Sequence, residues 1–351
     1  MKIENFKLLK QLSETAGAPG FEARVRQLIK SEGEKYVDNV SIDNMGNLTL
    51  YKKGHSNQKI MLAAHMDEIG FMVTHIDKNG FIRFQPLGGF DPKTVVSQRV
   101  VIHGKEDIYG VVSSKPIHIM SPEERKQNPK LKDFFIDTGR TQEELNQIIE
   151  TGNPITRDAT CIQMGNCVNG KSMDNRISVF ILLEVLRELK DIRLPYDVHA
   201  VFSVQEEVGL RGVQTATLGI QPDFAFAVDT TIAYDLPGAA EHESVSKLGE
   251  GVAIKLMDAG VIADYRMVKF MRETAKSNKI KYQAEALPAG GTDTARMQQF
   301  VKHGSIAGAF SIPTRHLHQT IESVHGEDIK SSIELIKACL QEIDSFDWTH
   351  D

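Results

Sequence analysis

Residues 59–67 read KIMLAAHMD, and the expected architecture follows from them. The run of apolar residues suits a β-strand buried on both faces, as in parallel sheets covered by helices. His65 and Asp67 stand where this strand is expected to end. Ligands in open α/β sheets gather at the carboxyl ends of the strands, so we expect both side chains at a functional site.

Strands and helices alternate along most of the remaining chain. Further strands are expected at residues 196–204, 224–228 and 304–312, where apolar residues cluster. Apolar residues at helical spacing predict helices at residues 6–16, 21–36, 175–190, 264–278 and 326–346. This alternation predicts an α/β fold with a mainly parallel sheet between helices.

Residues 71–166 differ, because they consist of short alternating segments separated by turn residues, a pattern typical of β structure. Within them, residues 141–144 (TQEE) match a capping box and predict one helix. The polar residues 121–133 predict a loop. We therefore predict one α/β domain of residues 1–70 plus 167–351, with a small β-rich domain of residues 71–166 inserted at a strand end.

Composition excludes several classes of protein. The 351 residues include 41 basic and 47 acidic ones, for a net charge of −6, which disfavours a nucleic-acid-binding surface. No stretch approaches the roughly 20 apolar residues of a membrane span, and the first residues do not resemble a signal peptide. Three widely separated cysteines do not suggest a disulfide framework. We expect a cytoplasmic protein that binds neither membranes nor nucleic acids.

Histidines and carboxylates follow each predicted buried strand, and one more carboxylate precedes the helix at residues 175–190. The candidates are His65, Asp67, Asp174, Glu206, Glu207, Asp229, His316 and His318. Imidazole and carboxylate ligands suit Zn²⁺, Co²⁺ or Mn²⁺. Two such ions can jointly activate one water, and a free carboxylate can act as the general base. Glu206 and Glu207 offer one ligand and one base.

Each candidate also has an ordinary structural explanation. A lone His-x-Asp is often structural, adjacent glutamates are usually solvated, and an aspartate such as Asp174 often caps a helix. Their shared position at predicted strand ends favours a metallohydrolase.

Six segments extend this interpretation: AHMDEIGFMV, KSMDNR, VQEEVGLRG, AVDTT, GGTDTAR and SIPTRHLH. In this order they resemble the glutamyl aminopeptidase family of dinuclear metallopeptidases, which includes the tetrahedral (TET) aminopeptidases. The resemblance implies a co-catalytic Zn²⁺ or Co²⁺ pair in an α/β domain, with Mn²⁺ possible. It also implies an inserted PDZ-like domain that mediates assembly of a homo-oligomer, based on dimers and typically a hollow tetrahedral dodecamer. The implied reaction removes N-terminal residues from short peptides.

The resemblance also implies a role for each candidate ligand. His65 and Asp229 would bind one metal ion. Glu207 and His318 would bind the other, and Asp174 would bridge the two ions.

Glu206 would be the general base, and Asp67 would orient the ligand His65 without binding the metal itself. Residues 291–293 resemble the family's loop near the substrate, with a positioning or structural role. The chain departs from the family at His316, where a tyrosine is usual, and at Gln319, where a serine is common. His316 is therefore a second candidate ligand, behind His318.

Three alternatives remain: a dinuclear hydrolase of another amide such as an N-acyl amino acid, a glycanase, and a non-enzymatic assembly protein with structural metals.

Preference for an N-terminal Glu or Asp would need a cation in the first subsite. Arg211, Lys247 and Arg315 are the candidates for that cation.

Overall fold

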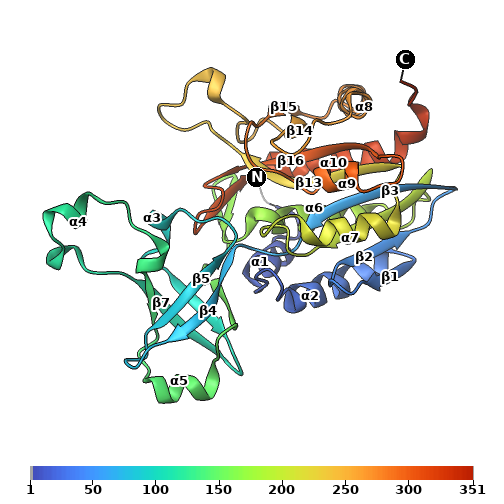
Figure 1. Ribbon diagram of the computed structural model, residues 1–351. Coiled ribbons are helices and arrows are strands. Elements are labelled where there is room, and N and C mark those ends of the chain that lie inside the picture. Colours follow the sequence, from blue (N-terminus) through green and yellow to red (C-terminus); the bar gives the residue numbers. More distant parts are fainter. Residues whose placement is uncertain (1–2, 351) are drawn as a thin grey trace.

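The computed structural model describes residues 3–350. A large mixed sheet with helices on both faces forms one unit, and a six-stranded closed barrel stands beside it (Figure 1). The large sheet has eleven strands, nine of them in the order β1-β2-β12-β3-β13-β16-β17-β11-β10, while β14 pairs with β15 and β16. Their bounds are β1 Asn39–Ile42, β2 Leu48–Lys52, β3 Ser56–His65, β10 Ile162–Met164, β11 Cys167–Gly170, β12 Tyr196–Ser203, β13 Phe224–Ile232, β14 Val252–Met257, β15 Tyr282–Ala286, β16 Ile306–Arg315 and β17 Glu322–His325.

The sheet is parallel at its four central strands, where the site lies, and between β14 and β15. β12 and β13 both pair with β3 in parallel, and β16 continues this direction beside β13. The flanking pairs are antiparallel, including β2 with β12 and β16 with β17. The prediction of a mainly parallel sheet therefore holds for the four central strands, whereas the whole sheet is mixed.

β3 is buried on both faces, as its apolar sequence predicts. Ile60 and Leu62 belong to the main core cluster on one face. Met61 and Ala63 point to the other face and join a smaller cluster there. Successive side chains of a strand alternate between faces, so such a run requires helices on both sides.

Helices cover both faces. The main core contains side chains of α1 (Phe6–Glu14), α2 (Ala23–Gly33), α6 (Met173–Glu188), α8 (Tyr265–Ser277) and α10 (Gly326–Glu342). The smaller cluster contains side chains of α7 (Arg211–Ile220) and α9 (Thr294–Gln299). α6 is buried on nearly all sides, because α1, α2 and α10 pack against it while it faces the sheet. Its start is thereby fixed at the sheet edge that carries the candidate ligands.

The barrel follows the order β4-β5-β8-β7-β6-β9 and has its own core. Its elements are β4 Gly70–Ile76, β5 Ile82–Leu87, α3 Pro92–Val95, β6 Arg99–His103, β7 Asp107–Ser113, α4 Pro122–Lys126, β8 Phe135–Asp137, α5 Gln142–Ile148 and β9 Pro154–Arg157. α5 starts at the predicted capping box. The loop prediction for residues 121–133 is wrong in part, because Ser121 and Glu124 form a second capping box that starts α4.

Within residues 3–350, none of the helices combines the length and apolar character that crossing a membrane requires.

Candidate metal centre

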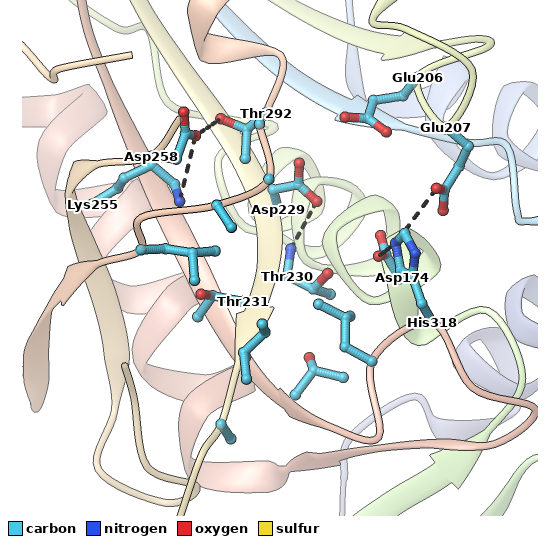
Figure 2. A pocket seen from close by; sticks show the side chains of 18 of the residues that line it. Asp174, Glu206, Glu207, Asp229, Thr230, Thr231, Lys255, Asp258, Thr292 and His318 are labelled. Atoms are coloured by element: carbon cyan, nitrogen blue, oxygen red, sulfur yellow. Dashed lines mark hydrogen bonds and ion pairs between the residues drawn. The ribbon is translucent and has the colours of Figure 1, made fainter. Parts of the chain in front are cut away.

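The candidate ligands converge at the carboxyl edge of the central strands. His65 is the last residue of β3, and Glu206 and Glu207 follow β12 directly. Asp229 lies within β13, which continues to Ile232, so the prediction that this strand ends before Asp229 is wrong. Because these strands run parallel, their ends meet on one side of the sheet (Figure 2).

His65 lies at the centre of the cluster and is almost fully buried. Its Nε2 is 3.1 Å from Asp174 Oδ1, 3.7 Å from Asp229 Oδ1 and 3.8 Å from Glu206 Oε2. Three carboxylates from different elements thus surround one ring nitrogen.

Asp174 lies between the two histidines. Its Oδ1 faces His65, while its Oδ2 is 3.2 Å from Nε2 of His318. Glu207 Oε2 lies 3.5 Å from the same His318 nitrogen. A carboxylate with one oxygen toward each histidine has the arrangement that a bridging ligand needs.

Asp67 contacts more of the site than expected. Its two carboxylate oxygens accept the main-chain N–H groups of Glu206, at 3.0 Å, and Glu207, at 3.1 Å. Nδ1 of His65 is 3.2 Å from the Asp67 main-chain oxygen and 3.5 Å from its Oδ1. Asp67 therefore fixes the turn that carries both glutamates, in addition to facing His65.

Glu322 belongs to the site although nothing in the sequence singles it out. The side chain is fully buried. It accepts the main-chain N–H of Asp174 at 2.9 Å and that of His318 at 3.1 Å, and so holds both segments. Burial raises the pKa of Glu322 to about 7.

Burial and crowding of charge shift several pKa values here. Burial, and then the neighbouring carboxylates, raise the pKa of Glu206 well above its usual range and that of Glu207 to about 8. Burial alone would lower the pKa of His318, but Asp174 and Glu207 raise it to about 10. Burying this many carboxylates costs free energy of folding unless cations balance their charge.

The donor chemistry fits two divalent cations. Two sets of three ligand atoms lie mutually within 4.8 Å, and both contain His65: one adds Glu206 and Asp229, the other Asp174 and Glu207. In addition, Oε1 of Glu207 is buried without a hydrogen-bond partner among the described residues. A buried carboxylate oxygen without a hydrogen-bond donor calls for a partner, and a cation can supply one.

A cavity of about 680 Å³ opens beside the ligands, a size typical of small-molecule sites. His316 and His318 both line it, but the described contacts to Asp174 and Glu207 come from His318. Much of its wall is apolar and includes Leu210, Ile232, Ala233, Tyr234, Leu236, Leu287, Ala289 and Leu317.

The cation in the wall of this cavity is Lys255, which sequence reasoning missed. Arg211, Lys247 and Arg315 are not among the described residues that line it. Arg315 instead forms two hydrogen bonds of 2.7 Å with Asp235.

Lys255 is buried and already paired. Its Nζ donates to Glu285 Oε1 and lies 3.7 Å from Asp258 Oδ2. Thr231 donates to the same Glu285 oxygen at 2.7 Å. Thr292 donates to Asp258 at 3.2 Å (Figure 2). This wall lies opposite His318 across the cavity.

The loop at residues 291–293 lies on the same side of the cavity as Lys255, since Thr292 donates to Asp258. Gly291 lines the cavity, and Asp293 accepts a hydrogen bond of 2.6 Å from Ser203, the last residue of β12. Asp293 thereby ties this loop to the strand that precedes Glu206.

Comparison with known proteins gives concordant matches. The family model described as M42 glutamyl aminopeptidase matches residues 46–335. A putative aminopeptidase of Acetivibrio thermocellus is 38% identical over 94% of this chain and 97% of its own length. A lysyl aminopeptidase of Pyrococcus furiosus is 33% identical over 98% and 99%.

Solved structures agree. The TET aminopeptidase of a marine sediment archaeon, Thaumarchaeota archaeon SCGC AB-539-E09, has a TM-score of 0.93 at 36% identity, covering 96% of each chain. The TET1 peptidase of Pyrococcus horikoshii has a TM-score of 0.86 at 29% identity, covering 96% of this chain and 99% of its own. That protein is described as assembling into a tetrahedron or a large octahedral shell.

Proposed function

Since this chain belongs to the M42 glutamyl aminopeptidase family and is an aminopeptidase, we propose how its own residues remove an N-terminal residue from a short peptide. The observation that carries the proposal is the position of Asp174, whose two oxygens face His65 and His318 separately. Two divalent cations, Zn²⁺ or Co²⁺ with Mn²⁺ as a further candidate, would fit this donor set.

The ligands divide into two groups around that bridge. His65 and Asp229, from adjacent strands, would hold one ion. Glu207 and His318 would hold the other, and Asp174 would contact both. When bound, such a pair polarises the substrate carbonyl and makes water more acidic.

Glu206 is the group we assign to proton transfer. It accepts a proton from the attacking water as the water oxygen bonds to the carbonyl carbon. As the C–N bond breaks, Glu206 gives this proton to the leaving amine. Asp67 keeps the carboxylate in place, because it holds the Glu206 main-chain N–H.

The first subsite would be the cavity beside Asp229. A preference for Glu or Asp would depend on Lys255, whose charge Glu285 and Asp258 already balance. The apolar part of the wall suits neutral side chains.

We also propose that residues 71–166 form a PDZ-like assembly domain and that residues 1–70 plus 167–351 form the catalytic domain. The barrel exposes Tyr109 and Val111 on β7, 66% and 43% exposed, with Ile117 and Ile119 nearby in sequence at 61% and 67%. Clustered exposed apolar residues are typical of interaction surfaces. A relative forms tetrahedral shells, and a closed homo-oligomer here would admit short peptides and exclude folded proteins.

Hydrolysis of leucyl and glutamyl p-nitroanilides, compared with their N-acetylated forms, tests this function. Only the free amines should be hydrolysed, and a chelator should abolish the reaction until Zn²⁺, Co²⁺ or Mn²⁺ is returned. Preferential cleavage of the acetylated forms would favour the alternative of an N-acyl amide hydrolase.

A further inference from the structure

The loop that carries His318 has a backbone that needs support from its surroundings. It joins β16 to β17, and the φ angles of His316 and His318 are 63° and 58°. Non-glycine residues rarely adopt this left-handed region. Such conformations persist where neighbouring groups impose them, often at functional sites.

Two hydrogen bonds between this loop and the barrel hold the loop in place. Arg157, the last residue of β9, donates from Nη1 to the main-chain oxygen of Gln319. Thr320 donates from Oγ1 to the main-chain oxygen of Thr94 at 2.8 Å. The two residues that follow His318 are therefore fixed by contacts that come from outside the α/β sheet.

The barrel also touches the ligands themselves, through the segment after β5. A Cβ placed on Gly89 would lie 3.3 Å from His318 Nδ1. One placed on Gly88 would lie 3.4 Å from the Cβ of Glu207, and the φ of Gly88 is +96°. The same Cβ on Gly88 would come within 2.6 Å of Ile69, so the segment can pass this close to the ligands because both residues lack side chains.

Arg157 reaches a second part of the site through Glu68. The arginine is 3% exposed, and its Nη2 lies 3.9 Å from Glu68 Oε2. Glu68 accepts hydrogen bonds from Lys171, at 2.7 and 2.8 Å, and from Ser172, at 2.5 Å. Those two residues lie just before Asp174 in the chain.

Arg157 is only partly satisfied in return. Its Nε and Nη2 have no hydrogen-bond partner among the described residues. A buried guanidinium with unpaired N–H groups is costly. Arg157 lies between the loop of His318 and Glu68 and contacts both, so it can hold them at a defined separation.

We propose that the barrel forms part of the second metal position, and that Arg157 is a positioning residue that fixes His318 relative to Asp174. This rests on the proposed function, because it assumes two ions per chain. His65 and Asp229 extend from β3 and β13, the central strands of the sheet, so the first ion should depend less on Arg157 than the second.

The test is a Co²⁺ titration of metal-free protein by equilibrium dialysis, with metal analysis of each sample. Wild type should bind two ions per chain. Arg157→Met should weaken one of them by about 10–100-fold, the usual effect of losing a group that supports a ligand, and weaken the other much less. Arg157→Lys should recover part of the loss, because it keeps the charge without the planar fork.

Arg24→Met is the matched control. Arg24 also joins the barrel to the α/β unit, through hydrogen bonds of 2.5 and 2.8 Å from α2 to Asp107, but it is half exposed and lies away from the ligands. It should bind both ions as wild type does. In a His318→Ala background, Arg157→Met should cause a smaller loss than in wild type, because much of its effect acts through His318.

Equal binding of both ions by wild type and Arg157→Met would overturn the inference while leaving the proposed function intact. Equal weakening of both ions by Arg157→Met, or the same effect from Arg24→Met, would also overturn it. Fewer than two ions on wild type would contradict the proposed function itself.

If Arg157→Met does not fold, Thr320→Val loses one hydrogen bond to the same loop and should weaken the same single ion. Unchanged affinities in Thr320→Val would then count against the inference.

Discussion

Glu206 and Glu207 are adjacent in the chain, yet their carboxylates face different histidines. Oε2 of Glu206 lies 3.8 Å from His65, and Oε2 of Glu207 lies 3.5 Å from His318. This separation follows from Asp67, which binds both main-chain N–H groups after β12 has ended. One carboxylate can therefore serve as a ligand while its neighbour transfers protons.

Replacing Glu206 by Gln should separate these two roles. We expect Glu206→Gln to keep both ions and to lose about 10²–10⁴-fold in kcat, since the amide cannot accept the proton of the attacking water. Metal analysis and anilide hydrolysis of the same sample measure both effects. Glu250→Gln, at an exposed position, is the control. Near-normal turnover in metal-replete Glu206→Gln would remove Glu206 from this role.

Substrate choice can be tested at Glu285. The carboxylate neutralises Lys255, the cation in the cavity wall. Glu285→Gln keeps the shape of the side chain and removes the closer of the two carboxylates that balance the lysine charge, leaving Asp258 at 3.7 Å. We expect the ratio of kcat/KM for glutamyl over leucyl p-nitroanilide to rise roughly tenfold, which corresponds to about 1.4 kcal/mol. An unchanged ratio would show that Lys255 does not contact the substrate side chain.

At the scale of elements, the spacing of apolar residues in the sequence predicted the strands and helices that are buried in a regular pattern. β3, β12 and the long helix α6 appear where apolar runs and helical spacing place them. The strands β14 and β17 and the short helix α9 were not predicted, because each is six residues or shorter. The two strands form by pairing with strands distant in the sequence, and α9 packs in the smaller core cluster, neither of which a local pattern contains.

The candidate site was predictable to a similar extent. Residues at strand ends could be found because parallel strands bring their ends together. Glu322 and Lys255 could not, since each acts through partners that only the folded sheet supplies. The contact of Arg157 with the His318 loop joins Arg157 to Gln319, which lie 162 positions apart in the chain. No spacing in the sequence indicates this contact.

The junction between α2 and the barrel gives a prediction for pH dependence. Hydrogen bonds from Arg24 lower the pKa of Asp107 from its ordinary 3.8 to about 2. Both side chains are more than a third exposed, so solvent limits the stabilisation to about 1 kcal/mol or less. A lowered pKa stabilises the fold above pH 3.8, and this contribution is lost as the pH falls through 2.

Urea unfolding of metal-free wild type and Arg24→Met measures this contribution. The difference in unfolding free energy should be at most about 1 kcal/mol at pH 7 and should shrink between pH 4 and pH 2. A difference that stays constant down to pH 2 would mean that the Arg24–Asp107 pair is not its source.

At the scale of the whole molecule, the barrel stands beside the α/β unit as a separate body with its own core (Figure 1). We propose two roles for it: to present the exposed side chains of β7 to other copies of the chain, and to hold the loop of His318. The two roles together would place the second metal position close to the assembling part of the molecule.

Light scattering on metal-replete protein tests the assembly. The account predicts a mass of about twelve times 39.1 kDa, because tetrahedral rotational symmetry relates twelve copies. A mass near that of one chain would contradict an assembly role for the barrel. A mass of about two chains would retain an interface and reject the closed particle.

We propose that this aminopeptidase works through two metal ions held on either side of Asp174. Stepwise addition of Zn²⁺ or Co²⁺ to metal-free protein, with leucyl p-nitroanilide hydrolysis measured at each step, tests this. We expect negligible hydrolysis without metal and full activity only as the second equivalent per chain binds. Full activity in metal-free protein, or a plateau at one equivalent, would contradict it.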